Sequence, residues 1–150
     1  MNFYDCFMYY DEDMLLDLRL NVLNNYVKKF VITESTYLHN GRPKTLKFDI
    51  KKFSKFKDKI KYIIVDKQPA NIEELKPSDT QHQKNSKLLI NALKRENFQR
   101  NRLQDGLSEA SDEDLVIISD VDEIPNLENF THKDMFSFFK QKMFYYKFNL

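Results

Sequence analysis

A short apolar run that ends in carboxylates constrains this chain more than any other stretch. Residues 115–118 read Leu-Val-Ile-Ile, and three acids, Asp120, Asp122 and Glu123, follow before Pro125 interrupts the backbone. Four consecutive apolar residues, three of them β-branched, favour a strand that is buried on both faces. In open α/β sheets the ligand crevice lies outside the carboxyl ends of the strands. The pattern therefore predicts a buried strand whose end carries a ligand site.

Further strands are predicted on both sides of this one. Aromatic and β-branched residues favour strands over residues 2–10, 27–33 and 62–65, and a last strand-like segment covers residues 143–149. The turn-like segment 35–44 puts Glu34 at the carboxyl end of the second strand. Several strands separated by helices or loops predict a sheet that is mixed but mainly parallel.

Three segments have the spacing of helices. Acids at residues 11–13 begin the first helix, whose broad apolar face includes Leu18 and Val22. A long helix is expected from about Asn85, and a short one over residues 136–142. The stripe of the long helix, at spacings of three or four residues, consists of Leu89, Leu93, Glu96, Arg100, Leu103 and Leu107. We therefore expect an α/β fold with helices on both faces of the sheet.

Composition excludes several classes of protein. A chain of 150 residues has the usual length of one domain, so residues 1–150 are expected to form a single unit. The net charge of +1 does not indicate a nucleic-acid partner. One cysteine and three widely spaced histidines do not form a zinc motif. With no signal-peptide pattern and no run of about 20 apolar residues, we expect a cytoplasmic protein without a membrane segment.

The Asp-x-Asp pair after the late strand has the chemistry of a metal site. Carboxylate oxygens suit hard cations, and Mg²⁺ is usually held by one or two carboxylates together with substrate phosphates. In the alternative interpretation, the acids only form a turn or cap the next helix. We favour a metal, because three carboxylates within four residues repel one another unless a cation compensates them. The predicted ligands of Mn²⁺ or Mg²⁺ are Asp120 and Asp122.

Two classes of enzyme use such a pair. In haloacid-dehalogenase-like phosphatases the first Asp is a nucleophile and the second an acid/base, but that motif follows the first strand. It also has Thr or Val two residues after the second Asp, whereas Ile124 occupies that position here. In A-type nucleotide-sugar glycosyltransferases, Asp-x-Asp follows a middle strand and holds the metal that bridges the diphosphate. The late position of the pair favours the second class.

Short motifs along nearly the whole chain point to one family. In order they are Asp5-Cys6-Phe7, Glu12, Leu15-Leu16, Arg19-Leu20, Phe30-Val31-Ile32, Glu34-Ser35, Gly41-Arg42-Pro43-Lys44, Gln99-Arg100 and Leu107. The most specific is the heptapeptide at residues 119–125, Ser-Asp-Val-Asp-Glu-Ile-Pro. This order resembles glycosyltransferase family 17, the β-1,4-N-acetylglucosaminyltransferases related to the enzyme that adds bisecting GlcNAc to the core mannose of N-glycans.

The resemblance implies an A-type glycosyltransferase fold and a metal-dependent transfer, with inversion, of GlcNAc from UDP-GlcNAc to a saccharide acceptor. Asp120 and Asp122 would bind the metal with the donor diphosphate, and Glu34 would contact uridine or ribose. Lys44 and Arg100 would add charged contacts to the donor. For these three residues a turn acid, a solvated lysine and an ion pair with Glu96 in the long helix are the alternatives.

Arg19 and Glu123 have other expected roles. Arg19 matches the family pattern but lies in a helix that looks like packing, so a structural salt bridge is expected. Glu123 is near enough to be considered as the catalytic base. Members of the family usually continue into an acceptor-binding half, which indicates a fragment or a minimal form. A truncated nucleotide-binding module without transfer activity is therefore one alternative function, and a haloacid-dehalogenase-like phosphatase is the other.

Overall fold

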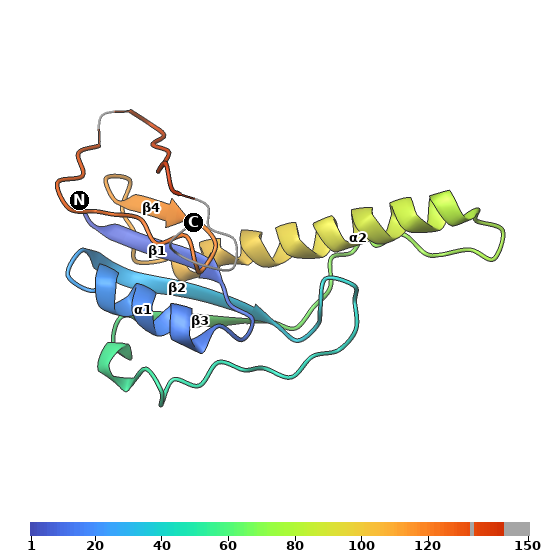
Figure 1. The fold of residues 1–150 in the computed structure, drawn as a ribbon, viewed down its shortest axis with the longest axis horizontal. Helices are drawn as coiled ribbons and strands as arrows, with labels where there is room; N and C mark the ends of the chain where they lie inside the picture. Colours follow the sequence, from blue (N-terminus) through green and yellow to red (C-terminus); the bar gives the residue numbers. More distant parts are fainter. Residues whose placement is uncertain (133, 143–150) are drawn as a thin grey trace.

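The chain forms an α/β fold around a parallel sheet. The computed structural model describes residues 1–132 and 134–142. In order, its elements are β1 (Phe3–Met8), α1 (Asp13–Leu23), β2 (Val27–Ser35), η1 (Ser54–Phe56), β3 (Ile60–Val65), α2 (Gln81–Asn101), η2 (Arg102–Gly106) and β4 (Leu115–Ile118). Within the described residues the sheet has the order β3-β2-β1-β4 (Figure 1). The predicted strands over 2–10, 27–33, 62–65 and 115–118 are confirmed.

All strand pairs of this sheet are parallel. β1 lies in the middle, where Cys6 is paired with Val31 of β2 on one side and with Ile118 of β4 on the other. The prediction of a mixed sheet is therefore not met by the described strands, which are parallel throughout. The strand predicted over residues 143–149 lies outside the described residues. Because the strands are parallel and adjacent in the order β3-β2-β1-β4, the carboxyl ends of β1, β2 and β4 lie at one edge of the sheet.

Helical segments cover both faces of the sheet, as predicted. On one face, α1 packs its leucines against alternate residues of the strands. This core includes Leu16, Leu20, Leu23, Phe7, Phe30, Ile32 and Ile117. On the other face, η2 and the loop after it pack on the remaining strand residues. That smaller core consists of Tyr4, Cys6, Val31 and Leu103. The two-residue alternation of β1 and β2 explains why both faces are apolar.

The long helix begins earlier and ends earlier than its apolar stripe suggests. Thr80 caps α2 in a reciprocal capping box with Gln83, which sets the start of the helix at Gln81. Its regular part ends at Asn101, and the tighter turn of η2 follows. Of the helices described, none has the length and apolar character that crossing a bilayer requires.

The apolar stripe of α2 does not mark its buried face. Leu89 is 64% exposed and Leu93 is 49% exposed, whereas the buried residues of the helix are Asn91, Arg95 and Gln99. The amino-terminal half of α2 projects beyond the sheet, so its neighbour is a loop and not the core (Figure 1). That loop needs hydrogen-bond partners for its backbone, which polar side chains supply.

The prediction of a short helix over residues 136–142 is wrong. The structure describes these residues as irregular chain, in which Phe139 packs against the core while Phe138 is 96% exposed. The ring of Phe139 lies 5.2 Å from that of Phe130. A helix of seven residues is too short to be stable without packing, and only one aromatic ring of this segment finds a site in the core.

We predict a large effect on stability for one of two matched truncations and almost none for the other. Leu20→Ala should lower the free energy of unfolding by ~2–5 kcal/mol, because it leaves a cavity under α1. Leu89→Ala should change it by less than about 0.5 kcal/mol, because Leu89 lies on the projecting half of α2. Urea unfolding followed by circular dichroism measures both values. A large loss for Leu89→Ala would contradict the exposed position of this stripe.

Candidate functional site

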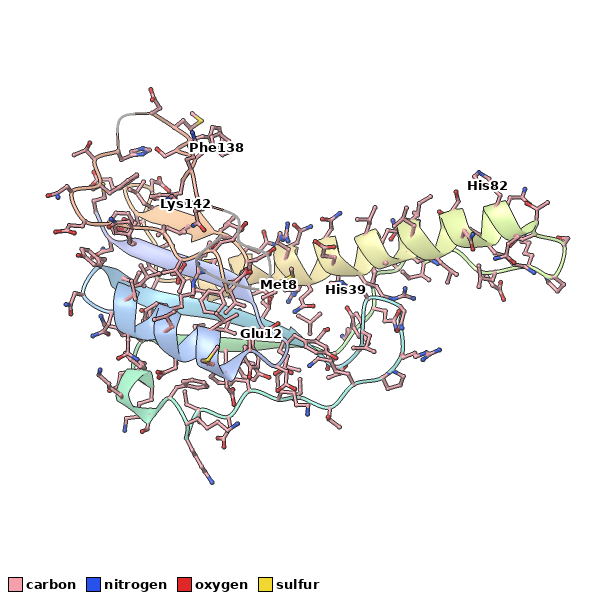
Figure 2. All side chains as sticks on the ribbon, in the orientation of Figure 1. Met8, Glu12, His39, His82, Phe138 and Lys142 are labelled. Atoms are coloured by element: carbon pink, nitrogen blue, oxygen red, sulfur yellow. The ribbon has the colours of Figure 1, made fainter. Side chains whose placement is uncertain are left out.

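A cavity opens at the edge of the sheet where β1 and β2 end. Its volume is about 660 Å³, within the range of small-molecule sites. Met8, Glu12 and His39, labelled in Figure 2, belong to its wall and come from three different segments. The other lining residues are Tyr9, Tyr10, Leu15, Ser35, Tyr37, Leu38, Asn40, Lys44, Glu96, Gln99, Arg100, Asp120, Val121 and Asp122. The expected crevice at the carboxyl ends of the strands is therefore present.

The segment after β4, residues 119–123, folds into a closed loop that we call the acid turn. The Glu123 amide donates to the Asp120 carbonyl oxygen at 3.0 Å, and the Asp120 amide donates to Oε2 of Glu123 at 3.0 Å. Val121 is buried in the main core. With Val121 anchored in the protein, Asp120 and Asp122 line the cavity from either side of it.

Arg19 of α1 lies beneath the acid turn. Its Nε and Nη2 donate to the two carboxylate oxygens of Asp5 at 2.8 and 2.7 Å, and both side chains are fully buried. Burial raises the pKa of Asp5, and the hydrogen bonds and charge of Arg19 oppose that rise. The guanidinium also lies over the ring of Phe7, 4.6 Å from its centroid. The predicted structural salt bridge of Arg19 is confirmed.

The same guanidinium binds the acid turn directly. Nη1 donates to the carbonyl oxygens of Asp120, Val121 and Glu123 at 2.7, 3.2 and 3.0 Å. Nη2 also donates to the hydroxyl of Ser119 at 2.7 Å. The contacts of Arg19 with the acid turn were not predicted from the sequence, because the pattern of a helix does not show which distant backbone groups a buried arginine contacts.

The acid turn places negatively charged side chains next to one another at the cavity. The side chain of Asp120 is 61% exposed, and its pKa is raised by partial burial and by the charge of Glu123. Nη2 of Arg100 opposes this at 3.4 Å from Oδ1 of Asp120. The same nitrogen donates to Glu96 at 3.2 Å, which confirms the expected helical ion pair. One arginine thus serves two carboxylates at the cavity.

The carboxylate oxygens at the cavity suit a hard cation that shares its ligands with a bound molecule better than a structural metal site, in which the protein supplies all the ligands. In the part of the chain that the structure describes, no three His, Cys, Asp or Glu side chains come together as a metal-binding group. The carboxylates of Asp120 and Asp122 line the cavity, which Glu12 and Glu96 also line. Mg²⁺ and Mn²⁺ accept such sparse sets when substrate phosphates and water complete the coordination. The residues present therefore fit a cation that binds together with an anionic ligand.

Glu34 lies behind the cavity wall and forms an ion pair with Lys44, which belongs to the wall. Glu34 is fully buried, and its carboxylate accepts hydrogen bonds from the amides of Lys47 at 2.8 Å and Phe48 at 3.1 Å. It also accepts from the Tyr62 hydroxyl at 2.8 Å and from Nζ of Lys44. Lys44 lines the cavity, and its Nζ lies 5.2 Å from the centroid of the Tyr10 ring. Glu34 therefore supports the wall from outside the cavity.

Four of the six residues predicted for the site line the same cavity. They are Lys44, Arg100, Asp120 and Asp122. Glu123 does not line it, because its carboxylate turns back to the Asp120 amide and borders a second, smaller hollow. Glu34 stands behind Lys44. The cavity thus collects the predicted charges from three separate parts of the chain.

The loop at residues 37–43 contributes residues 37–40 to the cavity wall and was predicted only as part of the turn-like segment 35–44. Arg95 of α2 holds it by donating to the His39 carbonyl oxygen at 3.0 Å. Gly41 has a φ of 86°, and a Cβ there would lie 2.7 Å from Nη2 of Arg95. The Asn40-Gly41 pair signals such a turn in the sequence, but its packing against a buried arginine is tertiary information. His39 and Asn40 enter the cavity wall for this reason.

A parallel sheet with a charged cavity at its carboxyl edge is the arrangement in which open α/β proteins place their ligand sites. The chain belongs to glycosyltransferase family 17, whose family model matches residues 1–139. This confirms the family inferred from the motifs and establishes the class of activity as glycosyl transfer. Comparisons with curated proteins and with solved structures gave no match.

The raised pKa of Asp120 predicts a gain in stability when its charge is removed. Its native pKa lies above its ordinary value of 3.8, so ionisation of this carboxyl favours the unfolded chain as pH rises through that interval. Asp120→Asn should therefore be more stable than the wild type at neutral pH. The difference should disappear at about pH 3, where both states are protonated.

Urea unfolding in EDTA across this pH range checks the prediction. Asp112→Asn, which removes an exposed acid just before β4, is the matched control and should show no such gain. Equal or lower stability of Asp120→Asn at neutral pH would contradict the raised pKa of Asp120, to which burial and the charge of Glu123 contribute.

Proposed function

We propose that this glycosyltransferase binds a UDP-sugar together with Mn²⁺ or Mg²⁺ in the cavity beside the acid turn. The observation that carries the proposal is the gathering of Asp120, Asp122, Arg100 and Lys44 around one cavity in a family 17 chain. A nucleoside diphosphate needs cationic partners for its phosphates. Two carboxylates for a cation and two basic side chains match that need.

Asp120 and Asp122 would hold the cation, which when bound neutralises negative charge on the diphosphate leaving group. Arg100 reaches the cavity from α2, already beside Asp120, so it can turn between that carboxylate and a phosphate oxygen. Lys44 reaches it from the loop after β2. The diphosphate would therefore lie between the acid turn and these two basic groups.

Glu34 contributes to the donor site through Lys44. All four of its hydrogen-bond contacts go to protein donors, and its carboxylate lies outside the cavity. A contact of Glu34 with uridine or ribose, which the family resemblance implies, stays a prediction. The geometry supports an indirect part, in which Glu34 fixes the ammonium of Lys44 beside the ring of Tyr10.

We propose that the sugar is GlcNAc and that it passes to a saccharide hydroxyl with inversion. The hydroxyl oxygen forms a bond to the anomeric carbon, while the bond from that carbon to the diphosphate oxygen breaks. UDP leaves with the electron pair, and the hydroxyl proton passes to a base. Glu123 is poorly placed to be this base, because its carboxylate closes the acid turn outside the cavity.

Removing one metal ligand tests the donor site. Asp122→Ala should abolish the Mn²⁺-dependent part of UDP-GlcNAc binding, and the protein should remain folded, because Asp122 is exposed. Asp112→Ala removes the same charge from an exposed site before β4 and should bind like the wild type. Isothermal titration with and without Mn²⁺ measures both. Unchanged Mn²⁺-dependent affinity of Asp122→Ala would contradict the assignment.

A second assay separates an enzyme from a binding module. With UDP-GlcNAc, Mn²⁺ and a panel of mannose-containing oligosaccharides, the proposed transferase releases UDP and a lengthened glycan. A nucleotide-binding module would bind the donor but release no product from any acceptor. Mass spectrometry of the glycan detects the transfer, so hydrolysis of the donor alone would count against the proposal.

A further inference from the structure

Arg19 connects three parts of the molecule that meet under the cavity. The arginine belongs to α1, its carboxylate partner Asp5 belongs to β1, and its remaining acceptors belong to the acid turn. We infer that Arg19 is a positioning residue for the cation site, because it sets the direction in which Asp120 and Asp122 leave the backbone. This inference rests on the proposed function, which places a cation at these carboxylates.

The geometry uses every donor of the guanidinium. A guanidinium has five N–H groups in a rigid plane, and here they meet six acceptors in Asp5 and the acid turn. The two oxygens of Asp5 fix that plane from the strand side. The turn is therefore placed relative to β1 through one rigid group. A lysine keeps the charge but cannot span both sets of acceptors.

The contacts act on the peptide groups that determine the direction of the carboxylates. The carbonyls of Asp120 and Val121 belong to the two peptide planes between Asp120 and Asp122, and Nη1 of Arg19 binds both. Within the described residues, the Asp122 carboxylate makes no hydrogen bond that could orient it from the cavity side. Its direction is thus set from below, by the backbone that Arg19 holds.

A purely structural role of Arg19 makes a different prediction. The buried pair with Asp5 would then stabilise the packing of α1 on β1, and losing it would lower stability without changing cation binding in folded molecules. A positioning role predicts a loss in both. Groups that orient metal ligands from behind typically change metal affinity by ~10–100-fold when they are removed.

Three variants separate these roles. Arg19→Lys keeps a buried positive charge but loses the fork. Ser119→Ala removes an acceptor of Nη2 at the turn, together with the hydrogen bond that the same hydroxyl donates to the Glu123 carbonyl oxygen at 3.1 Å. Leu23→Ala is the matched control, because it destabilises the same helix through the apolar core alone. If Arg19→Lys does not fold, Ser119→Ala still tests the inference, since Ser119 lies outside the cores.

Two measurements are made on each variant: titration of UDP with and without Mn²⁺, and exchange of the Asp120 and Glu123 amide hydrogens by NMR. We expect the Mn²⁺-dependent affinity to fall by about 10-fold or more in Arg19→Lys. In Ser119→Ala, which loses two hydrogen bonds of the turn, it should fall by about 5-fold or more. Both amides, which close the acid turn, should exchange faster in these two variants and not in Leu23→Ala.

Two outcomes would overturn the inference. In the first, the variants lose stability like Leu23→Ala but keep the Mn²⁺-dependent affinity of the wild type. In the second, the exchange of the turn amides stays unchanged. A failure of the proposed function looks different, because the wild type itself would then show no Mn²⁺-dependent binding of UDP, whatever the amides of the turn do.

Discussion

The cavity depends on a buried ion pair between a helix and the central strand. Arg19 and Asp5 are both removed from water, which is costly for each charge unless its hydrogen-bonding groups are satisfied. Here the surplus donors of the arginine are satisfied by the acid turn. Removing one partner of such a pair typically costs ~3–5 kcal/mol, because an uncompensated charge stays buried. Folding of α1 onto β1 and formation of the turn are therefore linked through one side chain.

The opposite side of the cavity is built on the same principle. Arg95 holds the loop at residues 37–43 from α2, and Glu34 holds Lys44 and the following loop from β2. In each case a buried polar residue of a regular element binds backbone or side chains of an irregular segment. Irregular segments carry most of the cavity wall, but the groups that fix them lie in strands and helices. This arrangement presents charged groups to a ligand while limiting their movement.

Features of the fold that depend on local patterns could be predicted from the sequence. The apolar run before Ser119 predicts β4, and the acids after it predict the charged edge of the sheet. The leucines of α1 predict a packed helix, although Leu18 and Val22 of the expected face are exposed because α1 buries only one side. The residues of the capping box at Thr80 were also present in the sequence. The start of α2 was nevertheless predicted at about Asn85, because that prediction followed the apolar stripe.

What could not be predicted depends on which distant groups meet. The stripe of α2 predicts packing through Leu89 and Leu93, but that part of the helix lies beyond the sheet and buries Asn91 against a loop instead. Glu34 was expected in the site and stands behind it, because the loop folds back to supply three donors and Tyr62 of β3 supplies a fourth. The motifs, in contrast, identified the family correctly, since residue order needs no knowledge of contacts.

The most direct test of the donor site is a site-resolved titration of the wild-type protein with UDP and Mn²⁺. Paramagnetic Mn²⁺ broadens NMR signals of nearby amides, so it reports where the cation lies. We expect UDP and Mn²⁺ together to broaden the amides of Tyr10, His39, Arg100 and Asp122, which line the cavity from different parts of the chain. Broadening centred on another surface would contradict this placement of the donor site. Broadening that does not depend on UDP and does not favour the acid turn would contradict it as well.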